Sequence, residues 1–348
     1  MGLKLSILDH SPIIDAKSST EAFQRTIELA QKAEAWGYHR FWVTEHHNSE
    51  RLAGSSPEVL ISHLLAKTSR IRVGSGGVML QHYSPYKVAE NFNVLASLAP
   101  GRVDLGIGRG PGGMPQSTKA LKPIDGEAKP FPDKLVALGQ FLRNQVNVDE
   151  DHPLYGLRAS PSPEQPADVY LLGTTTASAE LAASLGMPYV FALFLNSDEQ
   201  VMAESIDLYQ RQFDFTQGTR PQTLLGLPVM VTDTDEEAAE LASQVTVVRI
   251  RLESGRSFML GTVEAAESFG KQSEEKYTIT VQQAIVIHGA PETVRKKLEA
   301  MQSRYHADEI IAVTQIPDFQ KRLYSFELLS DVFAQVTVAP SSINQGGI

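Results

Sequence analysis

Four polar or glycine-rich runs in the sequence could carry out chemistry, and the first is Glu45-His46-His47-Asn48. Two imidazoles beside a carboxylate can act as a general base, bind a substrate by hydrogen bonds, or hold a metal ion. Metal binding is the weaker interpretation, because a zinc site needs three or more protein ligands and the sequence has no HExxH motif and no cysteine. The remaining alternative is a polar loop whose histidines bond to the backbone.

The second run is Gly74-Ser75-Gly76-Gly77, at the end of an apolar segment. Glycine weakens a strand unless the backbone must approach another group closely or adopt a conformation that other residues resist. A ligand that lies against the strand would account for this run. A β-bulge or a packing requirement inside the fold accounts for it equally well.

The third run, Gly108-Arg109-Gly110-Pro111-Gly112-Gly113, matches GxGxxG literally. The dinucleotide-binding fingerprint requires a helix directly after the glycines, whereas Pro111, Pro115 and a long polar stretch follow here, so we reject that interpretation. A flexible glycine loop that presents Arg109 to an anion is the simpler hypothesis. An ordinary surface turn competes with it.

The fourth run is Gly173-Thr174-Thr175-Thr176-Ala177-Ser178, between a predicted strand and a predicted helix. Free backbone N–H groups and several hydroxyls at a helix N-terminus form an anion site that suits a phosphate group. Plain N-capping needs only one of these hydroxyls. We therefore favour phosphate binding.

The composition limits the kinds of chemistry. The 348 residues include no cysteine, so disulfides, iron–sulfur clusters and cysteine nucleophiles are excluded and redox chemistry would require a bound cofactor. The net charge is −10, whereas proteins that bind nucleic acids or membrane surfaces carry an excess of basic residues. The N-terminus does not read as a signal peptide, and the longest apolar run, Met187 to Leu195, is far shorter than a membrane helix. We expect a folded cytoplasmic protein without a membrane partner.

Short segments rich in β-forming residues alternate along the chain with segments whose apolar residues recur at helical spacing. These predicted strands and helices must position the four runs. Ser18 and Glu21 offer a capping box for the first helix, which Gly37 ends. The predicted strands are Leu3–Leu8, Arg40–Glu45, Ile71–Val78, Val103–Ile107, Val169–Gly173, Tyr189–Phe194, Leu224–Val231 and Glu309–Val313. The predicted helices of the second half are Asp133–Asn144, Thr176–Leu185, Asp198–Phe213, Asp235–Leu252, Pro291–Gln302 and Gln320–Phe333.

Eight strands with intervening helices predict a closed (β/α)8 TIM barrel of the α/β class, because the strands never follow one another directly and no segment resembles a cap domain. We expect one domain over 1–338, with insertions near 108–132 and 254–283 at the C-terminal mouth, and a frayed tail over 339–348. The insertions are candidate lids. In such a barrel the loops after the strands carry the chemistry, and all four runs lie there.

Taken together, the motifs resemble those of the bacterial luciferase-like flavin monooxygenases. The resemblance covers nearly the whole chain and rests on SILDHSP, FWVTEHHN, RIRVGSGGVMLQHYSP, LAPGRVDLGIGRGPGG, VYLLGTTTASAELAASLGMP, HGAPETV and DEIIAVTQIPDFQKRLYSFELL. It implies a TIM-like barrel that binds FMN at its mouth, as reduced FMN. The implied activity is an FMN-dependent monooxygenase that uses dioxygen to oxidise a small organic substrate.

The resemblance also implies roles for individual residues. Gly76 and Gly77 correspond to a non-proline cis peptide beneath the flavin ring. Arg109 corresponds to an arginine that contacts the phosphate group, and the phosphate loop comprises Gly173, Thr174, Thr175 and Ser178. His46 corresponds to a histidine that acts as a base or hydrogen-bond partner, and Glu45 to a carboxylate beside the flavin. No metal ligand is implied.

Some features depart from the family and leave alternatives open. The segment Ala192-Leu193-Phe194 stands where many relatives carry a histidine, so the polarity of the substrate is undetermined. A deazaflavin-dependent hydride-transfer oxidoreductase and a non-catalytic flavin-binding protein are the alternatives. No strong nicotinamide site is visible, so we expect a separate flavin reductase, and the resemblance implies a homodimer.

Overall fold

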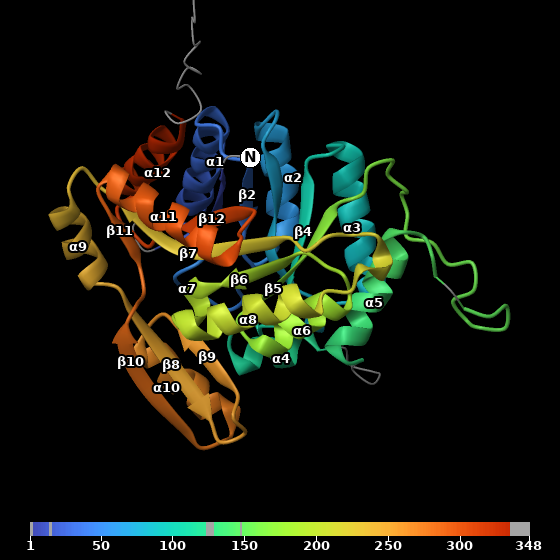
Figure 1. Ribbon diagram of the computed structural model, residues 1–348. Helices are drawn as coiled ribbons and strands as arrows, with labels where there is room; N and C mark the ends of the chain where they lie inside the picture. Colours follow the sequence, from blue (N-terminus) through green and yellow to red (C-terminus); the bar gives the residue numbers. More distant parts are fainter. Residues whose placement is uncertain (1–2, 14–15, 123–128, 147, 335–348) are drawn as a thin grey trace, which may run out of the picture.

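The structure, a computed structural model that describes residues 3–13, 16–122, 129–146 and 148–334, is built around a closed parallel β-barrel (Figure 1). The large sheet has the order β11-β7-β12-β1-β2-β3-β4-β5-β6, and β6 also pairs with β7, which closes eight of these strands into a ring. The ring consists of β1 (Lys4–Asp9), β2 (Arg40–Val43), β3 (Arg72–Met79), β4 (Val103–Gly108), β5 (Asp168–Gly173), β6 (Tyr189–Ala192), β7 (Thr223–Val231) and β12 (Glu309–Val313). The predicted TIM barrel is confirmed.

Helices connect the strands and cover the outside of the barrel (Figure 1). They are α1 (Ser19–Ala35), α2 (Pro57–Lys67), α3 (Pro85–Leu98), α5 (Phe131–Leu142), α6 (Thr176–Ser184), α8 (Glu199–Gln212), α9 (Asp235–Ser243), α11 (Pro291–Tyr305) and α12 (Phe319–Ala334). Ser18 caps α1 by accepting a hydrogen bond from the N–H of Glu21. The Glu21 carboxylate accepts from the N–H of Lys17 rather than from Ser18, so the predicted capping box forms only in part.

The alternation of side chains in β1 shows how the sequence builds two cores. Leu5 and Ile7 point outward and belong to the large cluster between barrel and helices, whereas Leu8 belongs to the small cluster inside the barrel. Burying both faces explains why the strands read as continuous apolar runs rather than alternating ones.

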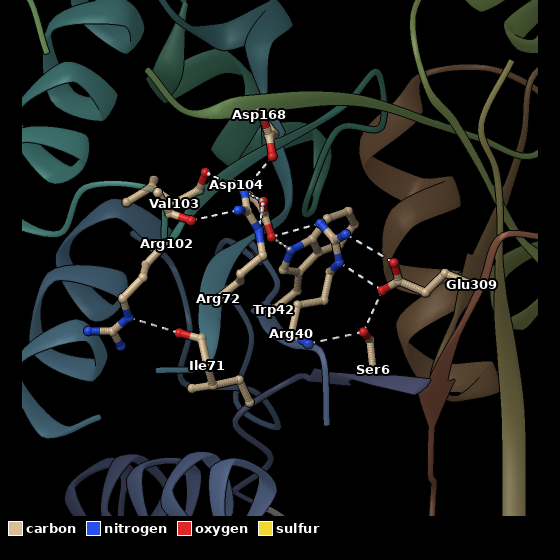
Figure 2. Close-up of polar contacts among 11 residues, drawn as sticks. Ser6, Arg40, Trp42, Ile71, Arg72, Arg102, Val103, Asp104, Asp168 and Glu309 are labelled. Carbon is tan, nitrogen blue, oxygen red and sulfur yellow. Dashed lines mark hydrogen bonds and ion pairs between the residues drawn. The ribbon is translucent and has the colours of Figure 1, made fainter. Parts of the chain in front are cut away.

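A buried ion network fills the end of the barrel at which the strands begin (Figure 2). Arg40 lies 2.9 Å from Asp104 through Nη1 and 2.7 Å from Glu309 through Nε, and Arg72 also pairs with Asp104. The indole Nε1 of Trp42 donates to Asp104 at 3.0 Å. Burial raises the pKa of Glu309, while the neighbouring Arg40 opposes that rise. This end is therefore occupied by its own side chains, and the opposite end is left for ligands.

An antiparallel unit over 246–283, here called the flap, hangs from the other end of the barrel (Figure 1). It contains β8 (Thr246–Leu252), β9 (Ser257–Leu260), α10 (Val263–Ser273) and β10 (Tyr277–Gln283), in the sheet order β10-β8-β9. The predicted helix Asp235–Leu252 is wrong beyond Ser243, because β8 follows there. The burial pattern of β8 alternates over Val248–Leu252, which suits a strand.

Three shorter elements complete the description. The seven-residue helix α4 (Pro115–Leu121) lies within the stretch expected to be irregular, and α7 (Leu193–Asn196) replaces the end of the predicted sixth strand. The strand β11 (Ile287–Gly289) pairs in parallel with the last residues of β7, Val229 to Val231. Residues 123–128, part of one predicted insertion, and the predicted tail 339–348 lie outside the described residues.

Among the residues that the structure describes, no helix combines the length and the apolar character that crossing a membrane requires.

Candidate active site at the mouth of the barrel

The four runs singled out in the sequence lie on one arc of the barrel mouth. The second run lies within β3, and the other three lie at or directly after the ends of β2, β4 and β5; these four strands are consecutive neighbours in the ring. The loops also contact one another directly. The backbone N–H of His47 donates to the carbonyl of Gly112 at 2.7 Å, which joins the loop after β2 to the loop after β4.

Glu45 is the centre of a hydrogen-bond network that ties these loops together. Its carboxylate is 1% exposed. Oε1 accepts from Nε2 of His47 at 2.7 Å and from the hydroxyl of Tyr83 at 2.8 Å, and Oε2 accepts from the N–H of Met79 at 3.0 Å. Burial, with the Glu45 charge as a further cause, raises the pKa of Tyr83. Tyr83 was missed in the sequence, although it closes the short 3-10 turn that follows β3.

His46 lies beside a second histidine, His10, at the end of β1. Their ring centroids are 5.7 Å apart. Nδ1 of His10 is hydrogen-bonded to Oγ1 of Thr44 at 3.2 Å. Burial lowers the pKa of His46 to about 3 and that of His10 to about 4, so both rings are neutral near pH 7. His10 was missed, although the rule that chemistry follows the strands should have found it.

The segment after β6 supplies an apolar wall at this place. The ring of Phe194 lies edge-on to His10 with centroids 5.8 Å apart. The segment Ala192-Leu193-Phe194 contains no histidine, and the imidazole of His10 lies against Phe194. The chain thus still has two imidazoles at the mouth, contributed by other strands.

Gly76 and Gly77 are joined by a cis peptide bond, as the resemblance implied. The register of β3 against β4 shifts between Gly76 and Val78, which is the β-bulge considered as one alternative. A Cβ on Gly76 would lie 2.6 Å from Cδ1 of Leu8, and one on Gly77 would lie 2.7 Å from the carbonyl oxygen of Gly106. The backbone of Gly106 therefore already requires a glycine at position 77, whereas a Cβ at position 76 would displace the end of the Leu8 side chain. Contact of either glycine with a flavin remains a proposal.

Arg109 lies directly after β4 and is exposed. Its side chain forms no hydrogen bond or ion pair with any residue in the described ranges. It is therefore available to bind an anion, as the glycine-loop hypothesis requires.

The loop before α6 uses two of its hydroxyls internally. Thr175 and Ser178 form a capping box, in which each side chain accepts from the backbone N–H of the other. The Ser178 hydroxyl also lies 2.9 Å from the hydroxyl of Tyr189. Gly173 permits this approach, because a Cβ there would collide with the Ser178 side chain. The capping interpretation is thus observed, and an anion would have to be bound by the remaining N–H groups and hydroxyls, including that of Thr174.

Two further residues missed in the sequence lie next to this loop. Nδ2 of Asn196, the last residue of α7, donates to the carbonyl of Thr174 at 2.6 Å. Nη2 of Arg249, in β8 of the flap, donates to the carbonyl of Asn196 at 2.6 Å. No local sequence signal links a residue of the flap to the loop after β5.

The two predicted lids contact each other in the structure. The N–H of Gln116 in α4 donates to Oε1 of Gln272 in α10 at 3.2 Å, and Nζ of Lys119 lies 3.3 Å from Oε1 of Glu274. Met114 packs against the small apolar core of the flap. The helix after β4 and the flap therefore form one continuous cover beside the mouth.

Glu45 and His47 bind each other, and within the described ranges no group of three or more acidic and histidine side chains is arranged to hold a metal ion. The polar chemistry of the mouth is that of imidazoles, hydroxyls, arginines and one enclosed carboxylate. Such a set can bind a polyanionic ligand and move protons, and it needs a bound group for redox chemistry.

Comparison with known proteins gives consistent results. The family model of luciferase-like monooxygenases matches residues 4–307. An N-acetyl-S-alkylcysteine monooxygenase of Bacillus subtilis (strain 168) is 40% identical over 336 residues, which cover 94% of this chain and 98% of the relative. The crystal structure of apo-MsnO8 is 30% identical with a TM-score of 0.75, covering 98% of this chain and 99% of that one.

A more distant solved structure shares the fold. It is the oxygenating constituent of 3,6-diketocamphane monooxygenase from Pseudomonas putida in complex with FMN, which is 18% identical with a TM-score of 0.70 and covers 98% of this chain and 100% of that one.

Proposed function

The chain belongs to the luciferase-like monooxygenase family, and we propose that it binds FMN, uses it as reduced FMN with dioxygen, and oxidises a small organic substrate. The observation that carries this proposal is that Arg109, which has no partner among the described residues, lies on the same arc of the mouth as the N-terminus of α6. Together they offer the charge and the N–H groups that a phosphate monoester needs.

The residues present fit FMN. Arg109, the backbone of Gly173 and Thr174, and the N–H groups at the start of α6 that the capping box of Thr175 and Ser178 leaves free would hold the phosphate group. Gly76 and Gly77 would lie against the flavin ring. When bound, the reduced flavin supplies the electrons for reaction with dioxygen, and the protein supplies binding, orientation and proton handling.

His46 is proposed as the catalytic residue that accepts or holds a proton. Because its imidazole is neutral near pH 7, a ring nitrogen with a free lone pair is present without prior deprotonation. His10 would lie on the same side and, through its hydrogen bond with Thr44, keeps one ring orientation. A pKa of about 3 makes His46 a weak base, so a hydrogen-bonding role is favoured over full proton abstraction.

Glu45 is proposed to act through the residues that it holds. All its contacts are to groups of the protein, and its carboxylate is buried. It thereby fixes His47, Tyr83 and the end of β3 relative to His46. We assign Glu45 a positioning role in the catalytic site.

The cover formed by α4 and the flap would exclude water from the mouth, which protects a reduced flavin from unproductive side reactions. We propose that 1–338 forms one domain in which these elements are insertions. A single calorimetric transition is expected, and two separated transitions would contradict it.

We base the proposed substrate class on the relative named N-acetyl-S-alkylcysteine monooxygenase. We propose a small thioether of this class as the first compound to test. The apolar ring of Phe194 beside His10 is compatible with the S-alkyl part of such a molecule.

We further propose a homodimer in the cytoplasm that receives reduced FMN from a separate flavin reductase. Val59 of α2 is 68% exposed, and Val94 and Leu98 of α3 are 44% and 67% exposed, which is apolar area suited to a second copy. Ultracentrifugation of wild-type protein and a Leu98→Glu variant tests this. A wild-type monomer would contradict it.

The deciding experiment is anaerobic titration with reduced FMN and with a reduced deazaflavin, followed by oxygen and substrate. Preferential binding of FMN and oxygen-dependent product support the proposal. Preference for the deazaflavin, or tight FMN binding without product from any reductant and substrate tested, supports the hydride-transfer enzyme or the non-catalytic binder instead.

A further inference from the structure

Arg249 is a cation from the flap that reaches the proposed phosphate loop. It lies in β8 between the buried residues Val248 and Ile250, and its side chain is half-buried at the junction with α7. Nη2 donates to the carbonyl oxygen of Asn196 at 2.6 Å and lies 3.4 Å from its Oδ1. Figure 1 shows the flap directly beside α7.

The partners of Arg249 are all neutral. Both contacts are to amide oxygens of one residue, and no carboxylate of the described residues lies within ion-pair distance of its guanidinium. A partly desolvated cation without a counter-charge is unfavourable, and a guanidinium retains further donors for an anion. An anionic ligand at this place would therefore neutralise Arg249, since none of the described carboxylates does so.

A single residue, Asn196, connects Arg249 to the loop before α6. Asn196 receives Arg249 on its oxygens and donates from Nδ2 to the carbonyl of Thr174 at 2.6 Å. The next residue, Ser197, has a buried hydroxyl that finds no hydrogen-bond partner among the residues described. The C-terminal end of α7 thus joins the flap to the residues that start the phosphate loop.

The charge of a phosphate monoester leaves room for a second arginine beside Arg109. The group carries about −1.5 to −2 near neutral pH. The hydroxyls of Thr175 and Ser178 are engaged in the capping box, so they add little. Arg109 alone leaves part of the charge without a counter-ion, whereas Arg109 and Arg249 together balance it.

We propose that Arg249 is a second phosphate-binding arginine, and that the phosphate group of the cofactor fastens the flap to the loop over 173–178. This inference rests on the proposed function. The inference adds to the proposed phosphate site a residue from outside the barrel. It also makes closure of the flap depend on the phosphate group rather than on the flavin ring.

The test compares FMN with riboflavin, which has the same ring and no phosphate, in titrations of oxidised flavin. Arg249→Met should weaken FMN binding by about tenfold or more and leave riboflavin binding within about twofold. The matched control is Arg251→Met, because Arg251 has the same charge on the same face of β8 and is exposed. It should bind both flavins as the wild type does.

A second measurement follows the flap without using activity. Trypsin cleavage after Lys271 and Lys276, both in the flap, should be slowed by FMN and not by riboflavin in the wild type. In Arg249→Met the FMN effect should be lost. If that variant does not fold, Arg249→Lys replaces it, with an intermediate loss for FMN alone, because an ammonium cannot form a two-pronged contact.

Equal losses for both flavins, FMN binding unchanged in the Arg249 variants, or FMN protection that survives the substitution would overturn the inference. A preference for FMN that depends on Arg109 and not on Arg249 would overturn this inference alone. A wild-type protein that does not prefer FMN to riboflavin would overturn the proposed phosphate site as well.

Discussion

Oε2 of Glu45 accepts a hydrogen bond from the backbone N–H of Met79 at 3.0 Å, which ties the loop after β2 to the last residue of β3. The same carboxylate binds Tyr83 and His47 through its other oxygen. One buried side chain therefore sets the distance between the loop that carries His46 and the strand end that carries Gly76 and Gly77.

Replacing Glu45 by Gln is expected to loosen this arrangement. An amide can accept at only one of its two ends, so at least one of the three donors is left without an acceptor, at a cost of ~1–3 kcal/mol in unfolding free energy. Turnover should fall more than flavin affinity. Glu50→Gln, at an exposed position of the same loop, is the control and should be neutral. Denaturant unfolding and steady-state kinetics measure both effects.

His46→Ala should bind flavin like the wild type and lose most coupled turnover, because the substitution removes the imidazole and leaves the proposed phosphate site intact. The control is His63→Ala on the exposed face of α2, which should keep full activity. Oxygen consumption and product formation are measured together. Unchanged turnover in His46→Ala would remove this residue from its proposed role.

Arg109→Ala should weaken FMN binding and leave riboflavin binding nearly unchanged, because the guanidinium would contact only the phosphate group. A loss of about tenfold or more is expected for FMN, with a weaker dependence on salt than in the wild type because Arg249 remains. Equal losses for the two flavins would show that Arg109 does not bind the phosphate group.

The two buried histidines at the mouth, His10 and His46, should make the folded protein less stable in acid. Burial, with the charge of Arg322 as the second cause, lowers the pKa of His10 from 6.5 to about 4, and burial lowers that of His46 to about 3. The unfolded chain then binds more protons below pH 6.5, so stability is present above pH 6.5 and is lost as the pH falls towards 4.

Thermal melts at pH 7 and pH 5 test this sensitivity. The drop in melting temperature should be smaller in His10→Gln, which cannot be protonated, than in the wild type. His63→Gln should leave the drop unchanged. Identical drops in all three proteins would show that His10 is not held neutral by the fold.

The ion network opposite the mouth should be far more important for stability than surface pairs. Asp104→Asn removes the shared partner of Arg40 and Arg72 and is expected to lower the unfolding free energy by ~3–5 kcal/mol. Asp207→Asn, which breaks an exposed pair with Arg211, should cost at most ~0.5 kcal/mol. Chemical denaturation distinguishes the two. Equal effects would contradict the assigned importance of burial.

Much of the barrel follows from local sequence. The Ser18 cap, the prolines that begin α2 and α3 (Pro57 and Pro85), and Gly37 with φ of 82° act within a few residues, so helix ends can be located along the chain. The helix predicted through Leu252 ends at Ser243, and the segment after it, which is rich in valine and isoleucine, forms the strand β8. This strand is stabilised by pairing with β9 and β10, which lie further along the sequence.

The sequence by itself determined the order of strands and helices, the loops that carry the chemistry and the family, because periodicity, capping and motif spacing are properties of neighbouring residues. Only the tertiary structure decided that His10 faces His46, that Glu45 is enclosed by three donors, and that Arg249 reaches Asn196 beside Thr174. These contacts join segments that lie far apart in the sequence. Pairing of the barrel strands and packing of the flap against α7 bring them together.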